Sequence, residues 1–204
     1  MPIEGYLEGR KISAVAGRLR SGCVAVLPTD TIYGFHCAYS NLPSIDRIRG
    51  LKGRSKGSGF ILLASSLAMV DSLVGRWPAG VRDILDTLWP APLTVIIPAS
   101  KSIPAALRPK GAVAVRIPAM ESLTTLIDKT GEPLVSTSVN LSGRQPLNRI
   151  DDIRFEFPGL DVYISRRGTG GLIPSTLLDL SGSEPRIVRP GRIARKAAVA
   201  FGID

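Results

Sequence analysis

The sequence predicts an α/β fold, a single twisted mixed or parallel sheet with flanking helices. Two observations lead to this prediction. Short apolar runs typical of buried strands recur along the chain, and helical patterns lie between several of them. Strands that alternate with helices are typical of a sheet covered by helices. No linker, repeat or compositional break divides the 204 residues, so we expect one domain over residues 1–204.

The first elements can be bounded from residue spacing. Four apolar residues at helical spacing predict a helix over residues 8–20, and Gly22 follows at a position that favours a left-handed backbone. The apolar run 23–27 predicts a buried strand, which Pro28 ends. Residues 32–38 are then expected to form a second extended segment.

The later elements follow the same alternation. A short helix is expected over 44–51, with Ser44 as its N-cap. Further strands are expected in the apolar runs 60–64, 93–97, 112–117, 134–137, 161–164 and 175–180. Further helices are expected over 66–74, 79–88, 121–129, 149–156 and 193–201. Ligands of such sheets bind outside the strand ends, so we expect the chemistry in loops that leave strands.

Composition narrows the function classes. Lys and Arg number 26 against 17 Asp and Glu, a net charge of +9, which favours polyanionic ligands such as nucleotides or nucleic acid. With one histidine and two cysteines fourteen positions apart, a Cys/His zinc site is not expected, and a Ser-His-Asp hydrolase would depend on His36 alone. We interpret His36 as a strand histidine with a satisfied ring. No apolar run approaches the roughly 20 residues of a membrane span and no signal peptide is evident, so we expect a cytoplasmic protein.

Two segments early in the chain could carry chemistry. Residues 28–34, Pro-Thr-Asp-Thr-Ile-Tyr-Gly, place hydroxyls and a carboxylate directly after a buried strand. A turn in which the Asp and Thr side chains hydrogen-bond to the local backbone explains this segment equally well. Residues 47–56 hold five cations and no acid, which favours a phosphate clamp of Lys52 and Arg54 over a merely solvated helix end.

Later segments add further candidates. Arg116 interrupts an apolar strand, and a buried cation needs an anion, either an internal acid or a substrate carboxylate. Residues 134–143 contain four hydroxyls and Asn140, neutral groups suited to phosphate, ribose or an amino acid. The glycines of 167–171 and the Val-Arg-Pro-Gly of 188–191 are more simply explained as turns. Neither a Walker motif nor a dinucleotide fingerprint is present.

Seven stretches taken in order resemble the YrdC-type threonylcarbamoyl-adenylate synthases. They are PTDTIYG (28–34), LKGR (51–54), LWPAPLTVIIPA (88–99), VAVRIP (113–118), PLVSTSVNLSG (133–143), GTGG…PST (168–176) and VRPG (188–191). The resemblance covers residues 10–193. It implies a YrdC-like α/β domain with a large basic concave face and, at this chain length, the short single-domain form.

The resemblance also implies an activity. Such enzymes make L-threonylcarbamoyl-AMP and pyrophosphate from L-threonine, bicarbonate and ATP, with Mg²⁺ carried by the ATP rather than by a protein metal site. The product serves the N6-threonylcarbamoyladenosine (t6A) modification of tRNA, so downstream threonylcarbamoyl-transfer proteins are implied as partners, with tRNA or double-stranded RNA as a further candidate ligand.

The site residues implied by the resemblance fall into three groups. Lys52 and Arg54 would be catalytic. ATP would be bound by Arg54, Ser58, Ser138, Asn140 and Arg189. Threonine would be bound by Thr31, Arg116, Ser136 and Ser175. Val139 stands where these enzymes usually have alanine, and we expect its larger side chain to tighten the pocket.

Two other functions are compatible with the same residues. A non-catalytic RNA-binding domain would use the basic face and bind RNA with strong salt dependence. The second alternative is transfer of an adenylate or carbamoyl group to an acceptor other than threonine, and it can be distinguished by replacing threonine with other amino acids. The resemblance favours the synthase over both.

Overall fold

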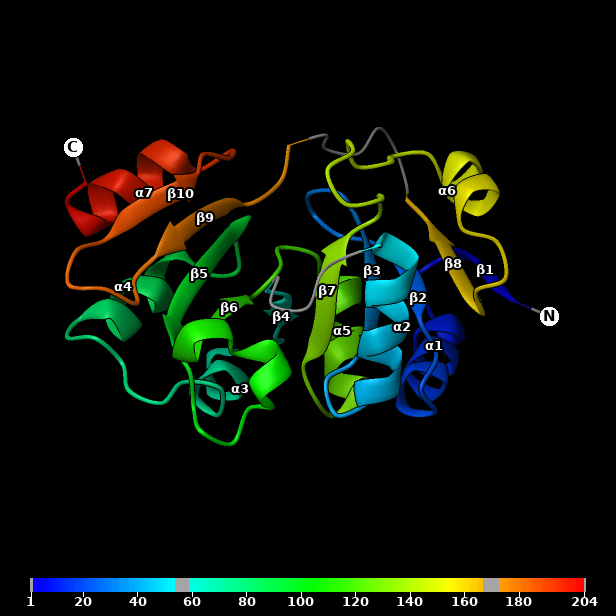
Figure 1. Cartoon of the computed structure of the whole chain (residues 1–204), viewed down its shortest axis with the longest axis horizontal. Helices are drawn as coiled ribbons and strands as arrows, with labels where there is room; N and C mark the ends of the chain where they lie inside the picture. Colours follow the sequence, from blue (N-terminus) through cyan, green and yellow to red (C-terminus); the bar gives the residue numbers. More distant parts are fainter. Residues whose placement is uncertain (1, 54–58, 167–172, 204) are drawn as a thin grey trace.

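Ten strands form one mixed sheet in the computed structural model, which describes residues 2–53, 59–166 and 173–203 (Figure 1). The strands are β1 (Ile3–Tyr6), β2 (Ala25–Pro28), β3 (Tyr33–Ala38), β4 (Ile61–Leu63), β5 (Leu93–Pro98), β6 (Ala112–Arg116), β7 (Leu134–Ser138), β8 (Val162–Ser165), β9 (Thr176–Asp179) and β10 (Arg186–Arg189). Their order across the sheet is β1-β8-β2-β3-β7-β4-β6-β5-β9-β10. The pairs β1–β8, β2–β8, β4–β6 and β5–β9 are parallel, and the remaining pairs are antiparallel. The predicted mixed sheet is therefore confirmed.

Helices flank this sheet, as predicted. They are α1 (Arg10–Arg20), α2 (Leu42–Lys52), α3 (Leu67–Asp71), α4 (Val81–Leu88), α5 (Glu121–Thr130), α6 (Ile150–Glu156) and α7 (Ala194–Phe201). Two 3-10 turns, η1 (Ala105–Leu107) and η2 (Pro109–Gly111), lie between β5 and β6. The two chain ends lie near opposite ends of the sheet (Figure 1).

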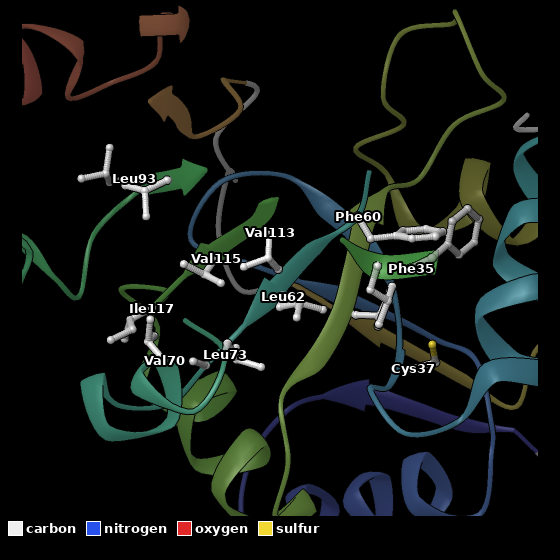
Figure 2. Close-up of a cluster of buried hydrophobic side chains, with 14 of the residues drawn as sticks. Phe35, Cys37, Phe60, Leu62, Val70, Leu73, Leu93, Val113, Val115 and Ile117 are labelled. Carbon is white, nitrogen blue, oxygen red and sulfur yellow. The ribbon is translucent and has the colours of Figure 1, made fainter. Parts of the chain in front are cut away.

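Alternation along the strands gives the sheet two buried faces. Ala25, Leu27, Leu63 and Leu134 pack with apolar residues of α1 and α5 on one face. Their sequence neighbours point the other way into the larger core, which includes residues of α2, α4 and α6. Figure 2 shows part of that larger core, with Leu62 and Val115 near its centre. The helices thus bury one face along its length and only part of the other.

Two expectations about the elements need correction. Helix α2 begins at Leu42 rather than Ser44, because the Asn41 side chain accepts a hydrogen bond from Ser44 N and Pro43 in the first turn needs no partner for a backbone N–H. Strands β1 and β10 were not predicted. Each has four residues of alternating burial at a sheet end, too short to stand out as an apolar run.

Within the part of the chain that the structure describes, no helix combines the length and the apolarity that crossing a bilayer requires.

Candidate active site

A cavity of about 660 Å³ opens over the sheet face that α1 and α5 cover only in part. One row of cross-strand partners runs along its floor. In order across β7, β4, β6, β5 and β9 the row consists of Ser136, Ile61, Ala114, Ile96 and Asp179. Directly paired residues share a face, so the sheet itself aligns these side chains. The volume lies within the roughly 300–1,000 Å³ of small-molecule sites.

This location differs from the expected one. We expected chemistry in the loops beyond the strand ends. The loops do contribute, through the 29–32 segment and the 174–175 segment, but the cavity also extends over the strands themselves. The reason is that α1 and α5 leave this part of the sheet face without a helix over it.

Arg116 and Asp30 form a buried ion pair at one corner of the cavity, with side chains 4% and 10% exposed. Arg116 Nη1 also donates to Thr31 Oγ1 at 3.0 Å, and its Nε donates to Ala91 O at 3.3 Å. Thr31 Oγ1 lies 2.9 Å from Thr29 Oγ1. The internal acid left open by the sequence is therefore Asp30, and the guanidinium is held rigidly at the cavity wall.

Arg189, the last residue of β10, provides a second cation that lines the cavity. Its Nε and Nη2 donate to Ser175 O at 3.2 and 3.0 Å, and Ser175 Oγ lies 2.7 Å from Thr94 Oγ1. Burial lowers the pKa of Arg189, and the positive charge of Arg116 lowers it further. Two partly desolvated guanidinium groups facing one cavity create a site that favours an anion.

Lys52 ends α2 and enters the turn that follows β7. Its Nζ donates to Ser138 O at 2.5 Å and to Asn140 O and Oδ1, both at 2.9 Å. Ser138 Oγ in turn donates to Asn140 Oδ1 at 2.5 Å. Ser138 Oγ also lies 3.5 Å from the ammonium, so this buried charge is next to a serine that lines the cavity.

The residues predicted for the site now have places. Six of them line the cavity: Thr31, Arg116, Ser136, Ser138, Ser175 and Arg189. Lys52 and Asn140 do not line the cavity themselves, but each forms a hydrogen bond with Ser138, which does. Arg54, Ser58 and the glycine segment 168–171 lie outside the described residues. The basic turn and the hydroxyl-rich turn, 86 positions apart at Lys52 and Ser138, therefore meet at one cavity.

Val139 does not tighten this cavity, contrary to expectation. Its side chain is fully buried in the larger core, which lies on the opposite face of the sheet from Ser136 and Ser138. Neighbouring residues of an extended segment point to opposite sides, so a larger residue between two cavity serines packs away from them.

The sequence analysis also missed several groups. Asp30 was seen only as part of a motif, although it pairs with Arg116. Lys110 lines the cavity and holds a left-handed backbone with φ 55°. Arg166 makes two contacts with the 29–33 segment. Its Nη1 donates to Thr31 O at 2.9 Å, and its guanidinium lies 5.3 Å from the ring centre of Tyr33. Lys110 could have been found from the sequence, because it directly precedes Gly111. No sequence pattern pointed to Arg166.

Comparison with known proteins places these features in a family. The Sua5_yciO_yrdC family model, described as "Telomere recombination", matches residues 18–191. This chain belongs to the Sua5/YciO/YrdC family. The predicted resemblance is therefore confirmed.

Individual members of the Sua5/YciO/YrdC family support the same assignment. The chain is 33% identical over 187 residues to the threonylcarbamoyl-AMP synthase of Methylococcus capsulatus, covering 89% of this chain and 100% of that protein. The crystal structure of P. abyssi Sua5 with L-threonine matches 99% of this chain and 60% of that one, with a TM-score of 0.89 and 28% identity. E. coli YciO matches 94% and 97%, with a TM-score of 0.85 and 24% identity, and supports the fold alone.

Proposed function

We propose that this protein is an L-threonylcarbamoyl-AMP synthase. It forms threonylcarbamoyl-AMP and pyrophosphate from L-threonine, bicarbonate and ATP. The observation that carries the proposal is one cavity lined both by the guanidinium groups of Arg116 and Arg189 and by several hydroxyl side chains, those of Thr31, Ser136, Ser138 and Ser175. A synthase relative of matching length and a threonine-bound structure of the same fold support it.

The amino acid fits the Arg116 corner. A guanidinium has five N–H groups, and the hydrogen bonds to Asp30, Thr31 and Ala91 engage three of them. With respect to the described residues, one N–H on each terminal nitrogen remains, and such a pair matches the two oxygens of a carboxylate. In our proposal these groups bind the threonine carboxylate, while the hydroxyls of Thr31 and Ser136 orient the rest of the molecule.

In our proposal the nucleotide binds in the same cavity as the amino acid. Arg189 and Ser138 would contact the phosphates, and Arg54, Ser58 and Asn140 are assigned to ATP by the family resemblance. Lys52 would act through its charge, which is held behind Ser138 rather than in direct reach of the cavity floor. In this proposal Mg²⁺ arrives coordinated by the ATP phosphates.

The chemistry then needs little from the protein beyond binding and charge. The threonine nitrogen and bicarbonate give a carbamate and release water. A carbamate oxygen forms a bond to the α-phosphorus of ATP, and the bond from that phosphorus to the bridging oxygen breaks to release pyrophosphate. Negative charge grows on the phosphoryl oxygens, where Arg189 and the charge of Lys52 stabilise it.

The product would serve t6A formation in tRNA, so in our proposal the enzyme works in the cytoplasm and passes threonylcarbamoyl-AMP to transfer proteins. The net charge of +9 is compatible with tRNA as an additional ligand. The RNA-binding alternative differs in one respect, because it requires no response to threonine.

The test is an omission assay on the purified protein. Pyrophosphate release from Mg-ATP should require both threonine and bicarbonate, and replacing threonine with other amino acids should slow it. Equal release without threonine would refute the proposal, and tight RNA binding without any nucleotide turnover would favour the RNA-binding alternative.

A further inference from the structure

His36 is a fully buried imidazole beside the cavity floor. Strand β3 places it directly opposite Ser136 of β7, and its Nε2 lies 3.2 Å from Ser136 Oγ. Ser136 lines the cavity. The floor row that runs from Asp179 to Ser136 therefore continues by one member, a polar ring that the proposed chemistry does not use.

Gly34 makes room for this ring. A Cβ at position 34 would lie 2.7 Å from His36 Cε1, 3.1 Å from His36 Nε2 and 3.2 Å from Ser136 Oγ. The first of these distances is shorter than real Cβ contacts, and the other two are tighter than most of them. The ring is therefore confined between the backbone of Gly34 and Ser136, with little freedom to turn away from the hydroxyl.

The surroundings of the ring decide where its single proton lies. Burial lowers the pKa of His36 to about 3; a backbone hydrogen bond at Gly34 opposes this shift and the charge of Arg116 adds to it, so the ring is neutral. His36 Nδ1 has no hydrogen-bond partner among the described residues. A buried N–H without an acceptor is among the rarest features of proteins, whereas a bare ring nitrogen leaves only a lone pair unmatched. The proton therefore belongs on Nε2, where Ser136 Oγ accepts it.

We propose that His36 is a positioning residue whose Nε2–H donates to Ser136 Oγ and so directs the Ser136 hydroxyl proton into the cavity, toward a carboxylate oxygen of the amino-acid substrate. The carboxylate is the matching group because Arg116 lines the same cavity. This inference rests on the proposed function for the identity of the substrate. The tautomer and its link to Ser136 do not depend on that function.

The first experiment reads the tautomer directly. His36 is the one histidine of the chain, so ¹⁵N-histidine labelling gives one imidazole in a long-range ¹H–¹⁵N NMR spectrum. At neutral pH we expect a protonated Nε2 and a bare Nδ1, with the Nε2 signal shifted in Ser136→Ala and unchanged in the exposed control Ser72→Ala. A protonated Nδ1, or a signal indifferent to Ser136→Ala, would overturn the proposal even if the enzyme is a synthase.

The second experiment measures steady-state kinetics with threonine and ATP varied separately. His36→Phe fills the site without a donor, and we expect it to raise the KM for threonine about 3- to 10-fold with little change in the KM for ATP. His36→Gln, which keeps an N–H donor, should recover part of the loss. A parallel rise in both KM values, or no change in either, would contradict a positioning role.

A double-mutant cycle separates positioning from packing. If His36 acts through Ser136, then His36→Phe should add little to the threonine KM of Ser136→Ala. Additive effects would overturn the proposal. If the unaltered protein does not respond to threonine at all, the proposed function fails, while the NMR result still decides the hydrogen-bond arrangement.

Discussion

Lys52 Nζ donates to both Asn140 O and Asn140 Oδ1, each at 2.9 Å, and so joins the end of α2 to the turn after β7. The ammonium is almost fully buried. It therefore contributes to stability as well as to the charge of the site, a dual role that a loosely solvated phosphate clamp would not have.

Lys52→Met should abolish threonine-dependent pyrophosphate release and also reduce the free energy of unfolding by about 1–3 kcal/mol, because buried oxygens lose their donors. Chemical denaturation and the pyrophosphate assay measure the two effects. Lys101→Met, at an exposed turn, is the matched control and should change neither. Full activity in Lys52→Met would remove Lys52 from the mechanism.

Arg116→Lys keeps the charge but loses the planar guanidinium that reaches Asp30, Thr31 and the substrate. We expect the KM for threonine to rise about tenfold or more, since a bidentate contact becomes a single one. Arg82→Lys disrupts a similar two-bond contact to Asp71 at the surface and should leave the KM unchanged. An unaltered threonine dependence in Arg116→Lys would contradict the assignment.

Gly191 holds the segment after β10 against the cavity wall. A Cβ there would lie 2.4 Å from Thr176 N and 2.7 Å from Pro174 O, both backbone atoms. Gly191→Ala should therefore cost about 1–3 kcal/mol of stability and weaken ATP binding through displacement of Arg189. Gly182→Ala, where a Cβ meets nothing within 4 Å, is the control. Equal melting temperatures and ATP affinities for the two variants would refute this packing argument.

The buried His36 should make stability depend on pH. Its pKa falls from 6.5 to about 3 on burial, so between these values the unfolded chain binds a proton that the folded chain does not. The free energy of unfolding should accordingly rise with pH across this range. Denaturant titrations at several pH values should show a shallower rise for His36→Gln. Identical slopes would show that the ring is not kept neutral by folding.

The central part of the sheet was predictable because β2, β5 and β6 are mostly apolar runs, each next to a helical pattern in the sequence. The end strands β1 and β10 were not, because four residues of alternating burial carry little local signal. Pairing with β8 and β9 makes them strands, and such pairing is a property of the whole chain.

The candidate site likewise has features that the sequence could predict and features that it could not. Arg116 could be identified from sequence as a buried cation in need of an anion, but Asp30 as its partner depends on a contact over 86 positions. The role of His36 depends on the register that sets it opposite Ser136 and on the missing Cβ of Gly34. Neither register nor close approach can be read from residue types alone.

The most direct test of the synthase account is product identification by mass spectrometry after incubation with ¹³C-bicarbonate, threonine and Mg-ATP. The account predicts threonylcarbamoyl-AMP that carries one ¹³C atom, formed together with pyrophosphate. An adenylate without the label, or no adenylate at all, would contradict it.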